Sequence, residues 1–293
     1  IIIIPLFCLL AFSCNKNPLK DASLSTEQKV EYLLGKMTIQ EKVDMISGVN
    51  TFYTVSNKRL GIPALKMTDG PLGVKIPDAT AFPAGVCMAA TWDTALIYQT
   101  GSAIGSEARS DGKNVLLGPT MNIHRLPGGG RNFESFSEDP YLASRMAVSY
   151  IKGVQSEGVI TTAKHFACNN QEYDRLAIDV QADDRTLNEI YYPAFRASVE
   201  EANCQAVMGA YNRLNGSYTC ASYDLLTKTL KNDWGFQGLV MSDWNAVHAV
   251  KENIDGGLDI EMPGGEFLKR DKVLNLINSK LVSEEQINDK VRR

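Results

Sequence analysis

Apolar and polar positions alternate along most of the chain in the manner of strands followed by helices. Short apolar runs, many with β-branched residues, are typical of buried strands. They lie at Ala64–Met67, Val115–Leu117, Ile160–Ala163, Ala206–Ala210, Leu239–Met241 and Leu258–Glu261. Longer stretches have apolar residues at helical spacing, at Glu27–Lys36, Ile39–Ile46, Thr94–Ser110, Leu142–Glu157, Thr186–Glu200, Leu225–Asp233 and Ala246–Asn253. This alternation predicts a mainly parallel sheet with covering helices, either doubly wound or closed into a barrel.

Polar residues follow nearly every predicted strand at its carboxyl end. Charged groups at the ends of several different strands are typical of the active site of a (β/α)₈ barrel. A doubly wound sheet would instead collect its ligand groups at one switch point, usually beside a Gly-rich phosphate loop. The chain has no GxGxxG or GxxxxGKS motif, and Gly128–Gly130 does not open an apolar helix. We therefore predict an α/β fold of the (β/α)₈ TIM-like barrel type for residues 26–293.

Length, charge and cysteine spacing exclude several classes of function. The 293 residues are enough for one large barrel. A net charge of -4 argues against a nucleic-acid partner, because phosphate binding needs a basic face. The cysteines after the N-terminal segment show no CxxC spacing and no companion His cluster, so we expect no structural zinc site, no other metal and no cofactor. Free buried thiols are the default, although an exported protein could pair some of them.

The first residues differ in kind from the rest. Residues 1–12 are almost wholly apolar and too short to span a bilayer, which fits the h-region of a signal peptide in residues 1–14 that lacks its beginning. Cys14 follows a small residue as in a bacterial lipobox, although Phe12 is bulky for that motif. A plain secretory signal or a buried N-terminal strand are the alternatives. We expect a polar tether at residues 15–25 and an exported protein, periplasmic or lipid-anchored to the outer membrane.

Two strand ends carry the sharpest candidates for chemistry. Asp243 follows a buried strand and precedes Trp244, an arrangement that suits a nucleophilic carboxylate beside an aromatic wall. The competing interpretation of Asp243 is a helix N-cap. Lys164 and His165 would be costly to bury without partners but could face a carboxylate and sugar hydroxyls. The competing interpretation of these two residues is a surface lysine next to a core histidine.

Four further residues are weaker candidates. Arg131 offers forked donors that fit vicinal hydroxyls or a carboxylate. Asp69 lies in a sequence typical of a turn, yet could accept two hydrogen bonds from sugar hydroxyls. Met208 and Tyr211 could provide an apolar floor and a phenol, and a buried core strand explains Met208 equally well. The acids at 138–139 precede Pro140 and indicate the start of a helix.

The segments MTDGPLGVK, GRNFESFSEDP, AKHFACNNQE, VMGAYNRLNG and VMSDWNAVH, in this order, closely resemble the N-terminal domain of glycoside hydrolase family 3. The resemblance implies a (β/α)₈-like barrel, sometimes partly collapsed, and retaining hydrolysis of β-glycosides from the non-reducing end. It implies that Asp243 is the nucleophile. It also implies binding of the terminal sugar at the matching positions, which are Asp69, Arg131, Lys164, His165, Met208 and Tyr211. Glu172 and Arg175 match a segment that shapes this pocket.

The chain departs from the family pattern in one respect. In the multidomain members that it resembles most, the acid/base Glu comes from an α/β sandwich domain after the barrel, so we expect that domain and its Glu beyond Arg293. Glu134, Glu138 and Glu172 are the acids nearby. The hexosaminidase branch has a KHFPGHG-type segment, which residues 164–170 do not match. We expect a β-glucosidase-like enzyme acting on β-linked oligosaccharides or aryl glycosides. The alternatives are β-xylosidase, mixed exo-glycosidase, or a non-catalytic sugar-binding barrel.

Overall fold

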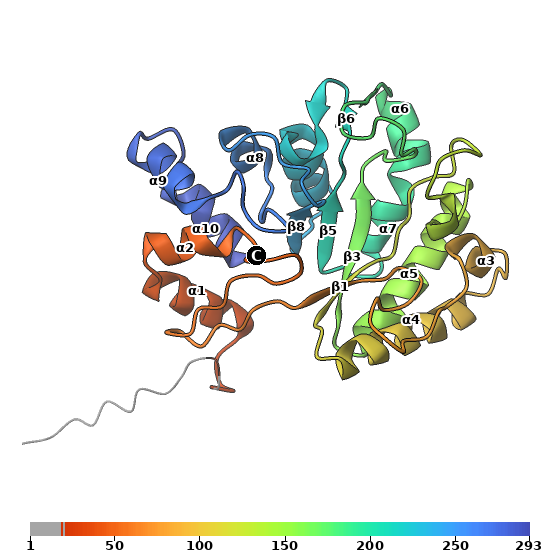
Figure 1. The fold of residues 1–293 in the computed structure, drawn as a ribbon, viewed down its shortest axis with the longest axis horizontal. Helices are drawn as coiled ribbons and strands as arrows, with labels where there is room; N and C mark the ends of the chain where they lie inside the picture. The colour runs from red at the N-terminus through yellow and green to blue at the C-terminus, as the bar shows by residue number, and fades with distance from the viewer. Residues whose placement is uncertain (1–18, 20) are drawn as a thin grey trace, which may run out of the picture.

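The computed structural model describes residues 19 and 21–293, and Figure 1 shows its ribbon. The predicted signal segment, Cys14 and part of the predicted tether lie outside the described residues. Five parallel strands form the centre, with each strand paired to the next in the order β1-β2-β3-β5-β8. Their bounds are Met67–Asp69 for β1, Val115–Leu117 for β2, Ile160–Phe166 for β3, Ala206–Gly209 for β5 and Leu239–Ser242 for β8.

Isolated bridges close this sheet into a ring. Met241 of β8 pairs in parallel with Ile260, and Ser47 pairs in parallel with Glu261. The antiparallel bridges Gly48–Thr54 and Tyr53–Lys66 then lead back to the residue before β1. The fold is therefore a barrel in which residues 260–261, 47–48 and 53–54 replace full strands, which agrees with the expectation of a partly collapsed barrel.

The closure explains two errors in the predicted strands. The predicted strand Leu258–Glu261 is reduced to bridges, because its residues contact both neighbours only at single positions. The predicted strand Ala64–Met67 begins only at Met67. Leu65 and Lys66 instead pair antiparallel with residues 53–54, where the Leu65 backbone N–H also donates to Thr54 Oγ1 at 2.8 Å.

Side chains along the strands alternate between the inside and the outside of the ring. Val115 and Leu117 belong to the interior cluster, whereas Leu116 between them belongs to the outer core under the helices. The same alternation holds in β5 and β8, where Met208 and Met241 are interior. Methionine is a large share of the interior, and its flexible side chain fills an irregular space well. The ring is thus a packed core.

The helices α4 (Thr94–Ser110), α5 (Pro140–Ser156) and α7 (Pro193–Glu200) lie side by side along one flank of the strands (Figure 1). Asp93 caps α4 by accepting from the backbone N–H groups of residues 95 and 96. A Cβ on Gly101 of α4 would lie 2.4 Å from the Tyr150 carbonyl oxygen of α5. That close approach needs glycine. The predicted start of a helix at Pro140 is confirmed.

The other flank holds α1, α2, α8, α9 and α10 (Figure 1). Capping boxes begin α1, α2 and α10, at Ser25, Thr38 and Ser283. The bounds are Thr26–Lys36 for α1, Ile39–Met45 for α2, Lys251–Gly256 for α8, Arg270–Asn278 for α9 and Glu284–Arg292 for α10. The shorter elements are α3 at Gly85–Ala89, η2 at Asn132–Glu134, α6 at Asp184–Thr186, η3 at Leu187–Tyr191, η4 at Thr219–Ala221 and η5 at Asp224–Asp233, with the small sheet β4 (Asp179–Val180), β6 (Arg213–Leu214) and β7 (Ser217–Tyr218).

Two predicted helices differ from the structure. The predicted helix Thr186–Glu200 is divided into α6, the π-helical η3 and α7, and α7 begins at Pro193, whose nitrogen cannot donate to the preceding turn. The predicted helix Ala246–Asn253 begins only at Lys251. Upstream of it, Asn245 has a φ of 67°, which is incompatible with a helix.

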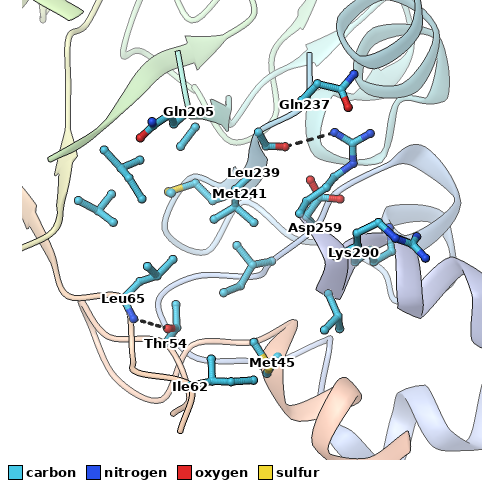
Figure 2. A pocket seen from close by; sticks show the side chains of 18 of the residues that line it. Met45, Thr54, Ile62, Leu65, Gln205, Gln237, Leu239, Met241, Asp259 and Lys290 are labelled. Carbon is cyan, nitrogen blue, oxygen red and sulfur yellow. Dashed lines mark hydrogen bonds between the residues drawn. The ribbon is translucent and has the colours of Figure 1, made fainter. Parts of the chain in front are cut away.

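An apolar cavity of about 520 Å³ opens at the amino ends of the strands (Figure 2). The first residues of four strands line it, Val115 of β2, Ile160 of β3, Ala206 of β5 and Leu239 of β8. In a barrel of this kind, chemistry belongs to the opposite, carboxyl end. Among the described residues, no helix has both the length and the apolar character that crossing a bilayer requires.

Candidate active site

The carboxyl ends of the strands bring the predicted residues together. Asp69 is the last residue of β1, His165 lies near the end of β3, Tyr211 follows β5 and Asp243 directly follows β8. Because the strands are parallel and adjacent in the ring, these ends meet at one edge. The site that the sequence predicted is therefore assembled from several strands.

An irregularity in β3 places two consecutive side chains in this site. The register of β3 against β5 shifts between Ala163 and Phe166. In a regular strand, Lys164 and His165 would point to opposite faces. Here Lys164 Nζ lies 2.7 Å from Asp69 Oδ1, and His165 Nε2 lies 3.6 Å from Asp243 Oδ2.

Lys164 and Asp69 form a buried ion pair. Lys164 is only 3% exposed, so the interpretation as a surface lysine is wrong. Burial of Asp69 opposes its ionisation, but Lys164 and the second ammonium, of Lys75, lower the pKa of Asp69 to about 2. The pair therefore stays charged, and each partner offsets the desolvation cost of the other.

Asp243 has one carboxylate oxygen in use and one free. The residue is 6% exposed, and Oδ1 accepts from the Trp244 backbone N–H at 2.7 Å. Oδ2 is buried without a hydrogen-bond partner among the described residues. The next helix begins only at Lys251, so Asp243 is not a helix N-cap. Burial raises the pKa of Asp243, against the opposing effects of Lys164, the Trp244 backbone N–H and the Tyr211 hydroxyl. A free oxygen in this position can contact a bound molecule.

His165 is held as a neutral ring. Burial lowers the pKa of His165 well below its usual range, and the charges of Arg131, Lys164 and Arg175 lower it further. A neutral imidazole has one N–H donor and one lone pair. The ring can therefore accept a hydrogen bond through one of its nitrogens.

Arg131 belongs to a network of guanidinium and carboxylate groups. Its Nε and Nη2 donate to the two carboxylate oxygens of Glu134 at 2.9 and 3.0 Å, and Nη1 lies 3.9 Å from Glu172. Arg175 also pairs with Glu172 and lies over the Tyr211 ring, 4.2 Å from its centroid. Although burial opposes it, pairing with Arg131 lowers the pKa of Glu134. The network fixes Arg131 and keeps Glu134 ionised.

Tyr211 and Met208 occupy different surroundings. Burial and the Asp243 carboxylate raise the pKa of Tyr211, so its phenol stays protonated and can donate. Met208 is packed in the interior cluster with Met241 and Met67, as the interpretation of a buried core strand predicts. Its part in binding a ligand stays a prediction.

Sequence reasoning named Glu134 only as a nearby acid and missed its ion pair with Arg131, for which the spacing of three residues was a signal. Asn122 was not named at all. It bonds to the backbone of His165, and its signal was a polar residue shortly after the buried strand β2. Trp244, predicted as a wall, donates through Nε1 to the Thr51 carbonyl oxygen at 2.8 Å.

The structure also describes the thiols and possible metal ligands. Cys168, Cys204 and Cys220 are buried and free, as expected by default, whereas Cys87 is free and exposed. In residues 21–293, no three His, Cys, Asp or Glu side chains gather as a metal site would require. The site instead combines a free carboxylate oxygen, a neutral imidazole, an ion pair and a phenol. Such donors and acceptors suit an uncharged molecule with several hydroxyl groups.

Comparison with known proteins shows the family to which the chain is similar. The model of the glycosyl hydrolase family 3 N-terminal domain matches residues 18–293. The beta-glucosidase of Rhizobium radiobacter is 44% identical over 271 residues, which cover 90% of this chain and 33% of the relative. The thermostable beta-glucosidase B of Acetivibrio thermocellus is 43% identical over 277 residues, covering 90% and 37%.

Solved structures show the same fold. The structure of beta-glucosidase 3B from Thermotoga neapolitana in complex with glucose superposes with a TM-score of 0.87 and 38% identity, covering 90% of this chain and 41% of that one. The chain spans about a third of the length of the curated relatives that it matches. Because the family model covers nearly all of it, the chain belongs to glycosyl hydrolase family 3, whose N-terminal domain it matches.

Proposed function

We propose that this chain is the barrel domain of a retaining β-glucosidase-like hydrolase that acts on terminal, non-reducing β-glycosides. The observation that carries the proposal is Asp243 Oδ2, a buried carboxylate oxygen at the carboxyl end of β8 that makes no hydrogen bond within residues 21–293. The relatives above are named beta-glucosidases, and the Thermotoga neapolitana protein binds glucose.

In the proposed first step, an Asp243 carboxylate oxygen forms a bond to the anomeric carbon as the bond to the leaving oxygen breaks. The electron pair of that bond goes to the leaving group, which needs a proton if it is a sugar. Water then attacks the anomeric carbon as its bond to Asp243 breaks, and the group that gave a proton in the first step takes one from this water. Asp243 returns as a carboxylate. Two inversions retain the β-configuration. Proton NMR of the first product formed from an aryl β-glucoside tests this, and an α-anomer would contradict it.

The nearby acids do not suit the proton donor. Glu134 is ionised by Arg131, Glu172 pairs with Arg175, and Glu138 is exposed at the approach to α5. A retaining mechanism needs a carboxyl group about 5–5.5 Å from the nucleophile that can carry a proton. We therefore place the proton donor outside residues 21–293.

The remaining side chains form the sugar-binding part of the proposal. Lys164 and Tyr211 offer donors, and Asp69 and His165 offer acceptors, so together they match hydroxyl groups that both donate and accept. Arg131 adds a fixed positive charge near Asp243. Bonds that strengthen as charge develops on the sugar raise the rate rather than only the affinity.

Replacing Lys164 with alanine should reduce activity far more than it reduces stability. We expect kcat/KM for dinitrophenyl β-glucoside to fall by about 100-fold, which corresponds to losing a charged hydrogen bond of roughly 3 kcal/mol. The matched control is Lys231→Ala, because Lys231 is also buried and pairs with Asp259 at 2.6 Å but lies away from the site. Both variants should lower the melting temperature. Equal activity in the two would contradict a role of Lys164 in binding sugar.

We also propose that the protein is exported and carries a lipid on Cys14, which lies outside the described residues. The support is the apolar segment that ends at Ser13-Cys14. Expressed in a bacterial host, the protein should enter the detergent phase on phase separation with Triton X-114, and Cys14→Ser should move it to the aqueous phase. The neighbouring substitution Ser13→Ala is the control and should change nothing. A wild-type protein in the aqueous phase would contradict the anchor.

A further inference from the structure

Asn122 holds His165 at both its backbone and its ring. It lies in the loop after β2 and is 6% exposed. Its Nδ2 donates to the His165 carbonyl oxygen at 2.9 Å, and the His165 backbone N–H donates to its Oδ1 at 2.9 Å. The same Oδ1 lies 3.2 Å from His165 Nδ1. One buried amide thus makes three contacts with a residue 43 positions later.

The two backbone bonds determine which way the amide faces. A backbone N–H can only donate, so the atom that it meets must be the amide oxygen, and the carbonyl oxygen must meet the amide nitrogen. The atom next to His165 Nδ1 is therefore an oxygen, which only accepts. Nδ1 must carry the hydrogen of this contact.

The protonation state of the other ring nitrogen, Nε2, follows from the charge of the ring. Burial and three neighbouring cations favour the neutral form of His165, which has a single N–H. With that hydrogen on Nδ1, Nε2 has a lone pair. Nε2 lies 3.6 Å from Asp243 Oδ2, which makes no hydrogen bond in the part of the chain that the structure describes. Two acceptors therefore face each other. The Tyr211 hydroxyl is a donor near the Asp243 carboxylate, and a hydroxyl of a bound molecule can donate to Nε2.

We propose that Asn122 is a positioning residue that fixes the Nδ1–H tautomer of His165, so that Nε2 accepts a hydrogen bond from a substrate hydroxyl beside Asp243. The identity of that hydroxyl as part of a sugar rests on the proposed function. The hydrogen on Nδ1 rests on the contacts of Asn122, and the lone pair on Nε2 follows because burial keeps the ring neutral. If Nε2 carried the hydrogen, it would donate to Asp243 and occupy the oxygen that attacks.

The tautomer can be measured without substrate. Long-range ¹H–¹⁵N spectra of protein labelled with ¹⁵N-histidine distinguish a protonated ring nitrogen from an unprotonated one. The chain has three histidines, so the signals of His165 are assigned by their loss in His165→Gln. At neutral pH we expect Nδ1 protonated and Nε2 unprotonated in the wild type. A proton on Nε2 would overturn the proposal.

Two substitutions of Asn122 test whether its acceptor oxygen sets the tautomer of His165. Asn122→Leu removes the acceptor, so the hydrogen should move to Nε2, toward Asp243, and the burst rate with dinitrophenyl β-glucoside should fall about 10- to 100-fold. Asn122→Asp keeps an acceptor oxygen, so Nδ1 should stay protonated. If Asn122→Leu does not fold, the spectra of the wild type and of Asn122→Asp still test whether Nδ1 of His165 carries the hydrogen. A retained Nδ1–H in Asn122→Leu, or its loss in Asn122→Asp, would overturn the role.

A matched control separates this role from ordinary packing. Asn253 of α8 is 1% exposed, and its Nδ2 donates to the Ala249 carbonyl oxygen. Asn253→Ala should lower stability but leave the His165 signals and the burst rate unchanged. The proposed function and the role of Asn122 can each be refuted without the other. A wild-type protein without any burst would contradict the proposed function, whereas a wrong tautomer would contradict the role of Asn122 alone.

Discussion

Asp243→Asn is expected to lower turnover of an aryl β-glucoside by roughly four orders of magnitude or more while the fold remains intact. The amide has nearly the shape of the carboxylate but cannot form the glycosyl-enzyme. Stability should not fall with activity. A carboxyl whose folded pKa is raised binds its proton more tightly in the folded state, so it destabilises the fold as pH rises through that pKa. At neutral pH, Asn removes this cost, and thermal melts should show an equal or higher melting temperature.

Two measurements identify the nucleophile directly. A 2-deoxy-2-fluoro dinitrophenyl glucoside should trap the covalent intermediate, and mass spectrometry of wild-type peptides should place the sugar on Asp243. In Asp243→Gly, added azide should attack the anomeric carbon in place of the carboxylate and yield an α-glycosyl azide. A label on another carboxylate, or no effect of azide, would refute the assignment.

The second large effect concerns the leaving group. Residues 21–293 should form the glycosyl-enzyme rapidly from dinitrophenyl β-glucoside, whose phenolate departs without a proton. Cellobiose should react slowly, because a general acid contributes about 10²–10⁴-fold and Glu134 is held ionised by Arg131. Rates across aryl glucosides of rising phenol pKa should therefore fall steeply. Ready cellobiose hydrolysis by this chain alone would show that an acid within the barrel had been overlooked.

Glu134→Gln and Glu172→Gln provide the matched test of that alternative. If either residue were the acid, its variant alone would steepen the dependence on the leaving group while the reaction with dinitrophenyl glucoside stayed normal. We expect neither to do so. Both should instead lower binding and rate for all substrates together, because each releases an arginine of the network, Arg131 or Arg175, from its partner.

The sequence by itself determined much of the local structure and which strand-end residues were candidates for the site. The predicted bounds of the strand Val115–Leu117 and of the helix Thr94–Ser110 are those observed, because apolar periodicity and an N-cap such as Asp93 act over a few residues. Lys164 and Asp243 were identifiable as strand-end residues for the same reason. Parallel strands then require such ends to share one edge.

Only the tertiary structure decided how the ring closes. The apolar run 258–261 had the pattern of a strand, yet residues 260 and 261 make single bridges, and residues 53–54 run antiparallel between their neighbours. Register across the ring depends on partners distant in sequence, which a local pattern does not contain. The predicted helix Thr186–Glu200 shows a second limit, since its apolar periodicity continues through the π-helical η3 and the start of α7 at Pro193 and does not reveal the change of helix type.

The tertiary structure also decided the electrostatics of each site residue. Asp69 and Asp243 are the same residue type at equivalent places, at or just after the end of a strand. Lys164, 95 positions after Asp69, bonds to it directly and together with Lys75 lowers the pKa of Asp69 to about 2. Asp243 is buried, one of its oxygens makes no hydrogen bond among the described residues, and its pKa is raised. Desolvation and charge depend on which groups surround a carboxyl in space, so one aspartate became half of an ion pair and the other the candidate nucleophile.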